Sequence, residues 1–203
     1  MTPPRPALAA VLVLLPALAA PSLIGVASAQ GGAAPGGAGD WSTLTPSVGV
    51  SAPLGAGYGP AWSDGPAVTV RVEAPAYGGR ARAEVRAAGY DAVAEGVPSF
   101  STLAPTLGWG PALRVGPVRL SAGARVGVVR FDIDDDAAGR LQSETELTVG
   151  GWGGAALRLG RVEVWAEVDG SRVPLSDPVA LWSVGGGVAL RLDTPGWLRA
   201  VLR

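Results

Sequence analysis

The strongest constraint on the fold is a strict alternation of side-chain character between residues 115 and 168. From Val118 to Val128, every second residue is aliphatic, and the residues between them are Arg, Ser or Gly. The segments 146–158 and 162–169, which flank a turn at residues 160–161, repeat this pattern. Because successive side chains of a β-strand point to opposite faces, the pattern predicts strands with one apolar face and one polar, partly charged face.

The alternation extends over most of the chain. It recurs in eight segments, whose approximate bounds are 43–54, 68–74, 81–88, 102–113, 118–128, 146–158, 162–169 and 182–192. The tight connections fall at 77–79, 115–117 and 160–161, and the long ones at 55–66, 90–98, 132–142 and 170–178. An even number of antiparallel strands, with short turns at one end and long loops at the other, is typical of outer-membrane β-barrels. Two segments contain proline, and we expect β-bulges at Pro46 and Pro105.

This arrangement resembles the small eight-stranded outer-membrane barrels, the OmpA/OmpX-like family of transmembrane domains. The resemblance covers about Asp40–Leu192 and rests on strand pattern and loop rhythm, without a signature motif. It implies an all-β, eight-stranded, antiparallel up-and-down transmembrane β-barrel. It also implies a monomer in contact with outer-membrane lipid and lipopolysaccharide, inserted by the barrel assembly machinery. The family usually ends on an aromatic residue, whereas here Leu192 precedes a tail in which Pro195 should end the strand.

The first residues have the features of a cleaved secretory signal peptide, which we assign to residues 1–29. An apolar run over 7–20 follows a basic residue, and Ala27-Ser28-Ala29 is a small–x–small cleavage site. We therefore expect an exported chain with a flexible Gly/Ala-rich lead-in over 30–42, a barrel over 43–192 and a C-terminal tail over 193–203. The expected location is the outer membrane of a Gram-negative-type envelope.

Composition excludes several classes of function. Charged residues make up 16 % of the chain, against about 25 % in soluble domains, which indicates that part of the surface does not face water. With 16 basic and 17 acidic residues, the chain has no excess of positive charge for binding nucleic acid. The absence of His and Cys removes the usual general base and thiol nucleophile, so we expect neither enzymatic activity nor a cofactor.

Residue size indicates which face is inside. The apolar faces consist of Ala, Gly, Val and Leu with almost no Phe or Met, and such residues are too small to fill a lumen. An eight-stranded barrel is only wide enough for its own side chains or one small ligand. We therefore predict an ion-paired, plugged lumen formed by Arg71, Glu73, Arg82, Glu84, Arg86, Arg119, Arg125, Glu146, Arg158, Glu163, Glu167, Asp169 and Arg191.

Two other functions remain open at this point. A narrow outer-membrane channel or transporter for small or apolar solutes needs the same facing but an open lumen. A soluble periplasmic ligand-binding barrel needs the opposite facing, with the apolar side chains inside, which the alternation alone also permits. The favoured interpretation is a structural or surface-interaction barrel of the outer membrane.

Aromatic residues and one acidic loop are further candidates for function. Aromatics near the segment ends predict girdles at the two membrane–water interfaces, formed by Trp41, Tyr58, Trp62, Tyr77, Tyr90, Trp182 and Trp197. The residues Asp132, Asp134 and Asp136 have the spacing that starts a calcium loop. Because the sixth position lacks Gly and the twelfth lacks Glu, we favour a solvated loop tip and predict no metal site.

Overall fold

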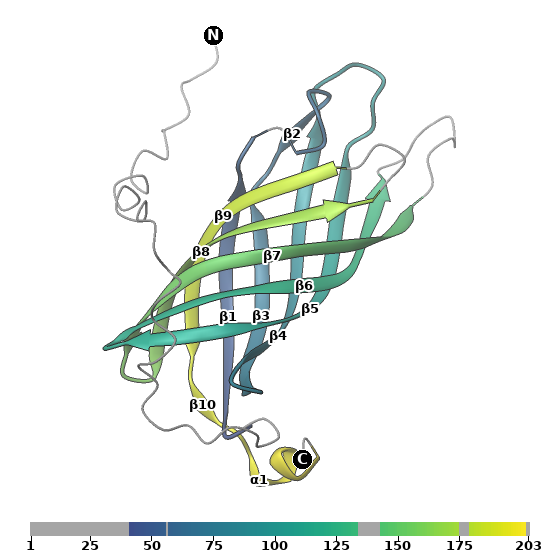
Figure 1. Ribbon diagram of the computed structural model, residues 1–203. Coiled ribbons are helices and arrows are strands. Elements are labelled where there is room, and N and C mark those ends of the chain that lie inside the picture. The colour runs from purple at the N-terminus through teal and green to yellow at the C-terminus, as the bar shows by residue number, and fades with distance from the viewer. Residues whose placement is uncertain (1–40, 56, 134–142, 175–178, 202–203) are drawn as a thin grey trace. The chain divides into compact units, whose positions relative to one another are not determined.

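The computed structural model describes residues 41–55, 57–133, 143–174 and 179–201 and shows an antiparallel sheet closed into a barrel (Figure 1). Eight strands form the wall: β1 (Thr43–Pro53), β3 (Ala67–Ala76), β4 (Gly79–Ala92), β5 (Phe100–Val115), β6 (Val118–Ile133), β7 (Glu144–Leu159), β8 (Val162–Val173) and β9 (Val179–Leu190). Each strand pairs with the next along the chain, and β1 also pairs with β9. The predicted eight-stranded up-and-down β-barrel is confirmed.

The register staggers the strands around the barrel. The backbone N–H of Leu54, just after β1, donates to the Trp182 carbonyl of β9 at 2.7 Å. When the cross-strand partner of each residue is followed from Trp182 through β8, β7, β6, β5, β4 and β3, the path returns to β1 at the position of Leu44. The path therefore returns to β1 near its opposite end. A stagger of this kind tilts the strands and, with eight of them, leaves an interior just wide enough for side chains. The side chains of the inner face therefore meet across the lumen.

Three short elements lie outside the wall. Strand β2 (Trp62–Asp64) pairs with the loop end of β4, and β10 (Leu192–Asp193) pairs with the start of β1. Helix α1 (Gly196–Val201) follows Pro195, whose carbonyl accepts the N–H groups of Leu198 and Arg199 at 3.1 Å. The helical residues within the described ranges are too few to cross a bilayer.

The strands extend further at the loop end than the alternation predicts. The expected loops at 90–98, 132–142 and 170–178 begin later, because β4 continues to Ala92, β6 to Ile133 and β8 to Val173. Cross-strand pairs such as Val173 with Val179 continue the hydrogen-bonded ladder through residues whose side chains no longer alternate. Pairing with the neighbouring strand therefore sets these boundaries.

The prediction of β-bulges at the two prolines is wrong. The β5–β6 register is the same on both sides of Pro105, as the pairs Leu103–Arg130 and Thr106–Gly127 show, although the ladder is interrupted between them. The β1 ladder is likewise interrupted at Pro46 without a change of register. A bulge would turn the following side chains to the opposite face, which the segregation of charges and aliphatic groups does not tolerate. The missing proline donor is therefore absorbed by a local gap in the ladder.

The apolar face of the sheet lies outside, and the polar face lies inside. On β6, Val126 is 51 % exposed whereas the neighbouring Arg125 is 7 % exposed. The same facing runs around the wall, so the outer surface is a band of exposed Val, Leu and Trp side chains. A band of this size matches lipid and is rare on proteins surrounded by water. This facing is the opposite of the one that a soluble barrel requires.

Candidate functional site

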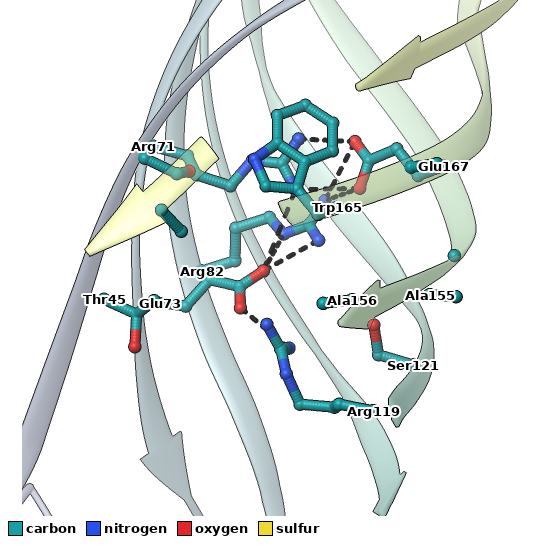
Figure 2. Close-up of a pocket in the computed structure, with 14 residues that line it drawn as sticks. Thr45, Arg71, Glu73, Arg82, Arg119, Ser121, Ala155, Ala156, Trp165 and Glu167 are labelled. Atoms are coloured by element: carbon teal, nitrogen blue, oxygen red, sulfur yellow. Dashed lines mark hydrogen bonds and ion pairs between the residues drawn. The ribbon is translucent and has the colours of Figure 1, made fainter. Parts of the chain in front are cut away.

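A continuous ion-pair network lies in the lumen, and Figure 2 shows the part of it around Glu73 and Glu167. The charged side chains that the described part of the chain contributes to it are Arg71, Arg80, Arg82, Arg86, Arg119, Arg125, Glu73, Glu84, Glu163, Glu167 and Asp169. The strand alternation places all of them on the inner face. Arg80 is absent from the predicted set, although it shares the inner face of β4 with Arg82.

The turn side of the network is centred on Glu73, which projects from β3. Its carboxylate accepts hydrogen bonds from Arg80 at 3.0 Å, Arg82 at 2.8 Å and Arg119 at 3.0 Å. Arg119 reaches onward to Glu163 at 2.8 Å and so connects β6 with β8. One carboxylate thus neutralises guanidinium groups from two different strands.

The middle of the network is centred on Glu167, which projects from β8. Arg71 of β3 donates two parallel hydrogen bonds to this carboxylate, at 2.6 and 2.8 Å. Arg82 of β4 adds a third at 3.1 Å. A bidentate arginine–carboxylate pair is among the strongest and most directional polar contacts in proteins. Figure 2 shows these side chains meeting across the lumen from the two sides of the barrel.

The loop side of the network is centred on Asp169. Arg86 donates to both carboxylate oxygens, at 2.9 and 2.7 Å, and the Ser183 hydroxyl donates at 2.6 Å. Arg125 contacts the same carboxylate and also donates to Glu84 at 2.9 Å. Glu84 in turn lies 3.4 Å from Arg71, so the loop side connects with the middle group. The network is therefore one connected unit.

Two tryptophans pack against the network from β7 and β8. The Arg71 guanidinium lies 3.8 Å from the ring centroid of Trp165, and that of Arg82 lies 4.2 Å from Trp152. Cation–π contacts of this kind strengthen when water is excluded. Glycines on β1 and β6 make room for the rings, because a Cβ at Gly49 would overlap Trp165 and one at Gly123 would overlap Trp152.

We expect Gly123→Ala to destabilise the barrel by about 1–3 kcal/mol, the usual cost of overpacking a filled interior. The added methyl would overlap the Trp152 ring, which the surrounding strands hold in place. Urea unfolding of the barrel in lipid vesicles measures the effect. Gly153→Ala is the matched control, since a Cβ at this position on β7 meets no atom within 4 Å. Equal stability of the two variants would contradict a tightly packed lumen.

Two cavities of different size lie beside the network. A cavity of about 10 Å³ lies against Arg71, Glu73 and Trp165, which is room for about one water molecule. A second cavity, of about 80 Å³, lies nearer the loops against Tyr58, Tyr90 and Arg86 among other residues. The larger cavity therefore lies on the loop side of the network.

An aromatic cluster occupies the loop end of the barrel. Tyr90 stacks on Phe100 with ring centroids 4.6 Å apart, and Tyr58 meets both rings edge-on at 4.8 and 5.2 Å. Phe131 contacts Tyr58, and the indole N–H of Trp62 donates to the Pro98 carbonyl at 3.0 Å. Burial raises the pKa of Tyr58 far above its usual range, with smaller contributions from Tyr90 and Asp64, so this phenol stays neutral.

The predicted girdle is divided between two environments. Tyr77, Trp182 and Trp197 are exposed by 72, 57 and 70 %, whereas Trp41 is half-buried near the start of β1. The structure places Tyr58, Trp62 and Tyr90 in the aromatic cluster instead. Tyr90 lies four residues after Arg86 on β4, so both side chains point to the inner face. This alternation predicts the inward direction of Tyr90, which its position near a segment end does not. Trp109, which the prediction omits, is 46 % exposed on the outer face.

Three predicted members of the network lie outside it. Arg158 is exposed at the turn after β7, where its Nε donates to the Gly160 carbonyl at 3.1 Å. Glu146 and Arg191 form no ion pair with another described residue. All three have inward strand parity, but they lie at the ends of the barrel, beyond the reach of the network. The alternation predicts that these side chains belong to the inner face, but it does not predict their position along the barrel axis.

The acidic loop is described only in part. Asp132 pairs with Arg130 at 2.9 Å, and both side chains are largely exposed. Asp134 and Asp136 lie outside the described residues. Across the ranges that the structure describes, no three metal-ligating side chains come together.

Comparison with known proteins gives matches of structure only. No model of a known protein family matches the chain, and no curated protein matches it either. The structure is similar to Neisserial surface protein A, with a TM-score of 0.59 and 13 % identity over 75 % of this chain and 97 % of that one. Lower scores are found for the N-terminal β-barrel domain of Pseudomonas aeruginosa OprF (0.49; 11 % identity; 74 % and 98 % covered) and for Ail of Yersinia pestis (0.44; 13 %; 74 % and 97 %).

Proposed function

We propose that this chain, which has the fold of the small eight-stranded outer-membrane β-barrels, is a structural or surface-interaction protein with a closed lumen. The observation that carries the proposal is the ion-pair network across the lumen, whose turn-side and middle groups leave a cavity of about 10 Å³, while a cavity of about 80 Å³ lies on the loop side. A conducting path needs a continuous column of water, and the smaller cavity holds about one molecule.

The energetics of the network support a permanent plug. The side chains of Arg71, Glu84 and Glu167 are each no more than 5 % exposed. Separating such a pair leaves a buried charge without a partner, which costs about 3–5 kcal/mol. A channel would have to break several of these contacts at once, so the solute-channel alternative requires a rearranged lumen.

The same network argues against catalysis. Each of its carboxylates is held by at least one arginine, and the chain contains no His or Cys. Carboxylates whose oxygens already accept hydrogen bonds from arginine are poorly placed to exchange a proton with a substrate. The proposed role is therefore not enzymatic.

The outer surface supports a place in the outer membrane. Its exposed Val and Leu side chains match a lipid environment, and exposed tryptophans occur near both ends of the wall. Lipid and lipopolysaccharide are the proposed surroundings, and the barrel assembly machinery is the proposed route of insertion. The closed sheet leaves no free strand edge in the wall, which is compatible with a monomer.

Planar-bilayer recordings test the closed lumen. We expect the purified barrel to show no steady conductance, and we expect the Arg71→Ala/Glu167→Ala variant to show brief or steady currents. This variant removes the bidentate pair while leaving the net charge unchanged. Arg130→Ala/Asp132→Ala is the matched control, because it removes an exposed ion pair outside the network. Large, steady conductance of the unmodified protein would contradict the proposal.

A further inference from the structure

The nearly neutral chain is strongly polarised along the barrel axis. At the turn end, the described charged residues outside the network are Arg114, Arg158, Arg161, Arg191, Arg199 and Asp193. At the loop end, they are Asp64, Asp91, Glu95, Asp132, Glu144, Glu146, Arg130 and Arg172. The described residues therefore form a basic end and an acidic end, although the whole chain has a formal net charge of –1.

The five turn-end arginines form a connected arc, which we call the basic arc. Arg114 lies at the end of β5, and the next hairpin is joined to this turn by a hydrogen bond from the Arg158 N–H to the Pro117 carbonyl at 2.9 Å. The Arg191 N–H donates to the Arg161 carbonyl at 2.8 Å. Arg199 belongs to α1, which β10 connects to the wall through its pairing with β1.

The guanidinium groups of the basic arc are available for binding. Arg114, Arg158, Arg161 and Arg199 are exposed, whereas Arg191 is half-buried. Within the described part of the chain, no carboxylate lies close enough to form an ion pair with any of them. The described residues therefore do not neutralise this positive charge.

The basic arc lies at the edge of the apolar band. Val115 and Leu159, each next to an arginine of the arc, are 59 and 57 % exposed. Trp197 of α1 is also exposed, and tryptophan side chains favour the headgroup level of a bilayer. Arginine side chains that border a lipid-facing surface can extend their charged ends into the headgroup layer. In the membrane position that the proposed function requires, the arc lies at the depth of the lipid phosphates.

We propose that the basic arc binds the phosphates of anionic phospholipids in the leaflet at the turn end. Guanidinium groups match phosphate oxygens in charge and in bidentate geometry. The acidic loop end carries the opposite charge, so the attraction is confined to one leaflet. This inference rests on the proposed function, because it requires the barrel to lie in a bilayer.

Native mass spectrometry tests the proposal with the barrel in mixed micelles of phosphatidylglycerol and phosphatidylcholine. We expect the unmodified barrel to retain phosphatidylglycerol in preference to phosphatidylcholine. Substituting Arg114, Arg158, Arg161 or Arg199 singly by Gln should lower this preference about five-fold, and substituting all four should abolish it. The loop-end double variant Arg130→Gln/Arg172→Gln is the matched control and should keep the preference.

Two results would overturn the proposal. One is an unmodified barrel without lipid preference, and the other is a loop-end variant that loses as much preference as the arc variants. Binding of purified cell-wall polymer that depends on the arc, without any lipid preference, would indicate a polymer as the partner instead. Heat-modifiable migration on a gel confirms that each variant is folded. A conducting lumen would contradict the proposed function and leave this lipid measurement unaffected.

Discussion

Glu73→Gln is expected to lower the free energy of unfolding of the barrel in lipid by about 3–5 kcal/mol, as for other buried ion pairs that lose one partner. The substitution preserves the shape of the side chain but removes the negative charge that Arg80, Arg82 and Arg119 share. These guanidinium groups would then repel one another in a space that excludes water. Urea titration of the barrel in lipid vesicles measures the change.

Two further variants show whether the charge is responsible. Glu144→Gln removes an exposed carboxylate at the loop end and should change stability by less than about 0.5 kcal/mol. Adding Arg80→Gln to Glu73→Gln should recover part of the loss, because one unpaired charge is removed together with its partner. A Glu73→Gln variant as stable as Glu144→Gln would show that the network contributes little to stability.

Val126→Arg is expected to destabilise the barrel in lipid by about 2–4 kcal/mol. Val126 lies on the outer face near the middle of β6, where it is 51 % exposed, so the new charge would enter the hydrocarbon layer. Unfolding titrations in bilayers of defined thickness measure the loss. Leu159→Arg is the matched control, since the same change at the end of β7 should cost only about 0–1 kcal/mol near the interface.

The comparison of these two variants tests the facing of the whole wall. A destabilisation that falls with distance from the middle of the strand is a property of a lipid bilayer and not of contacts within the protein. If Val126→Arg has no effect on stability, the outer face does not meet lipid, and the assignment of the barrel to a membrane is wrong.

The strand class was predictable because it depends on local pattern. The β6 alternation specifies which side chains share a face, and residue size assigns the charged face to the inside, where Arg119 and Arg125 lie. Even so, the strand ends at Ala92 and Val173 were missed, because ladder pairing continues beyond the alternation. The predicted bulges at Pro46 and Pro105 were wrong for a related reason. A change of register would cost more free energy than the loss of one ladder hydrogen bond at each proline.

The sequence predicted which side chains of the candidate site point into the lumen, but not where along the barrel axis they lie. Glu73, Glu167 and Arg71 were placed in the lumen from their parity, and the structure brings them together. Arg158 and Arg191 have the same parity, yet they lie at the turn end and belong to the basic arc. Tyr90 was assigned to the girdle from its position near a strand end, although its parity points it into the lumen.

The sequence by itself determined the β-barrel class, the two faces of each strand and which of them lies outside, because strand period and side-chain size are local properties. Only the tertiary structure decided which of the charges pair with one another. Arg71 and Glu167 are 96 residues apart, and they meet because the stagger of the closed sheet brings them to the same depth. That stagger depends on pairing around the entire circuit, which no single strand encodes. The same stagger separates the neutralised charges of the lumen from the arginines of the basic arc, which form no ion pair with another described residue.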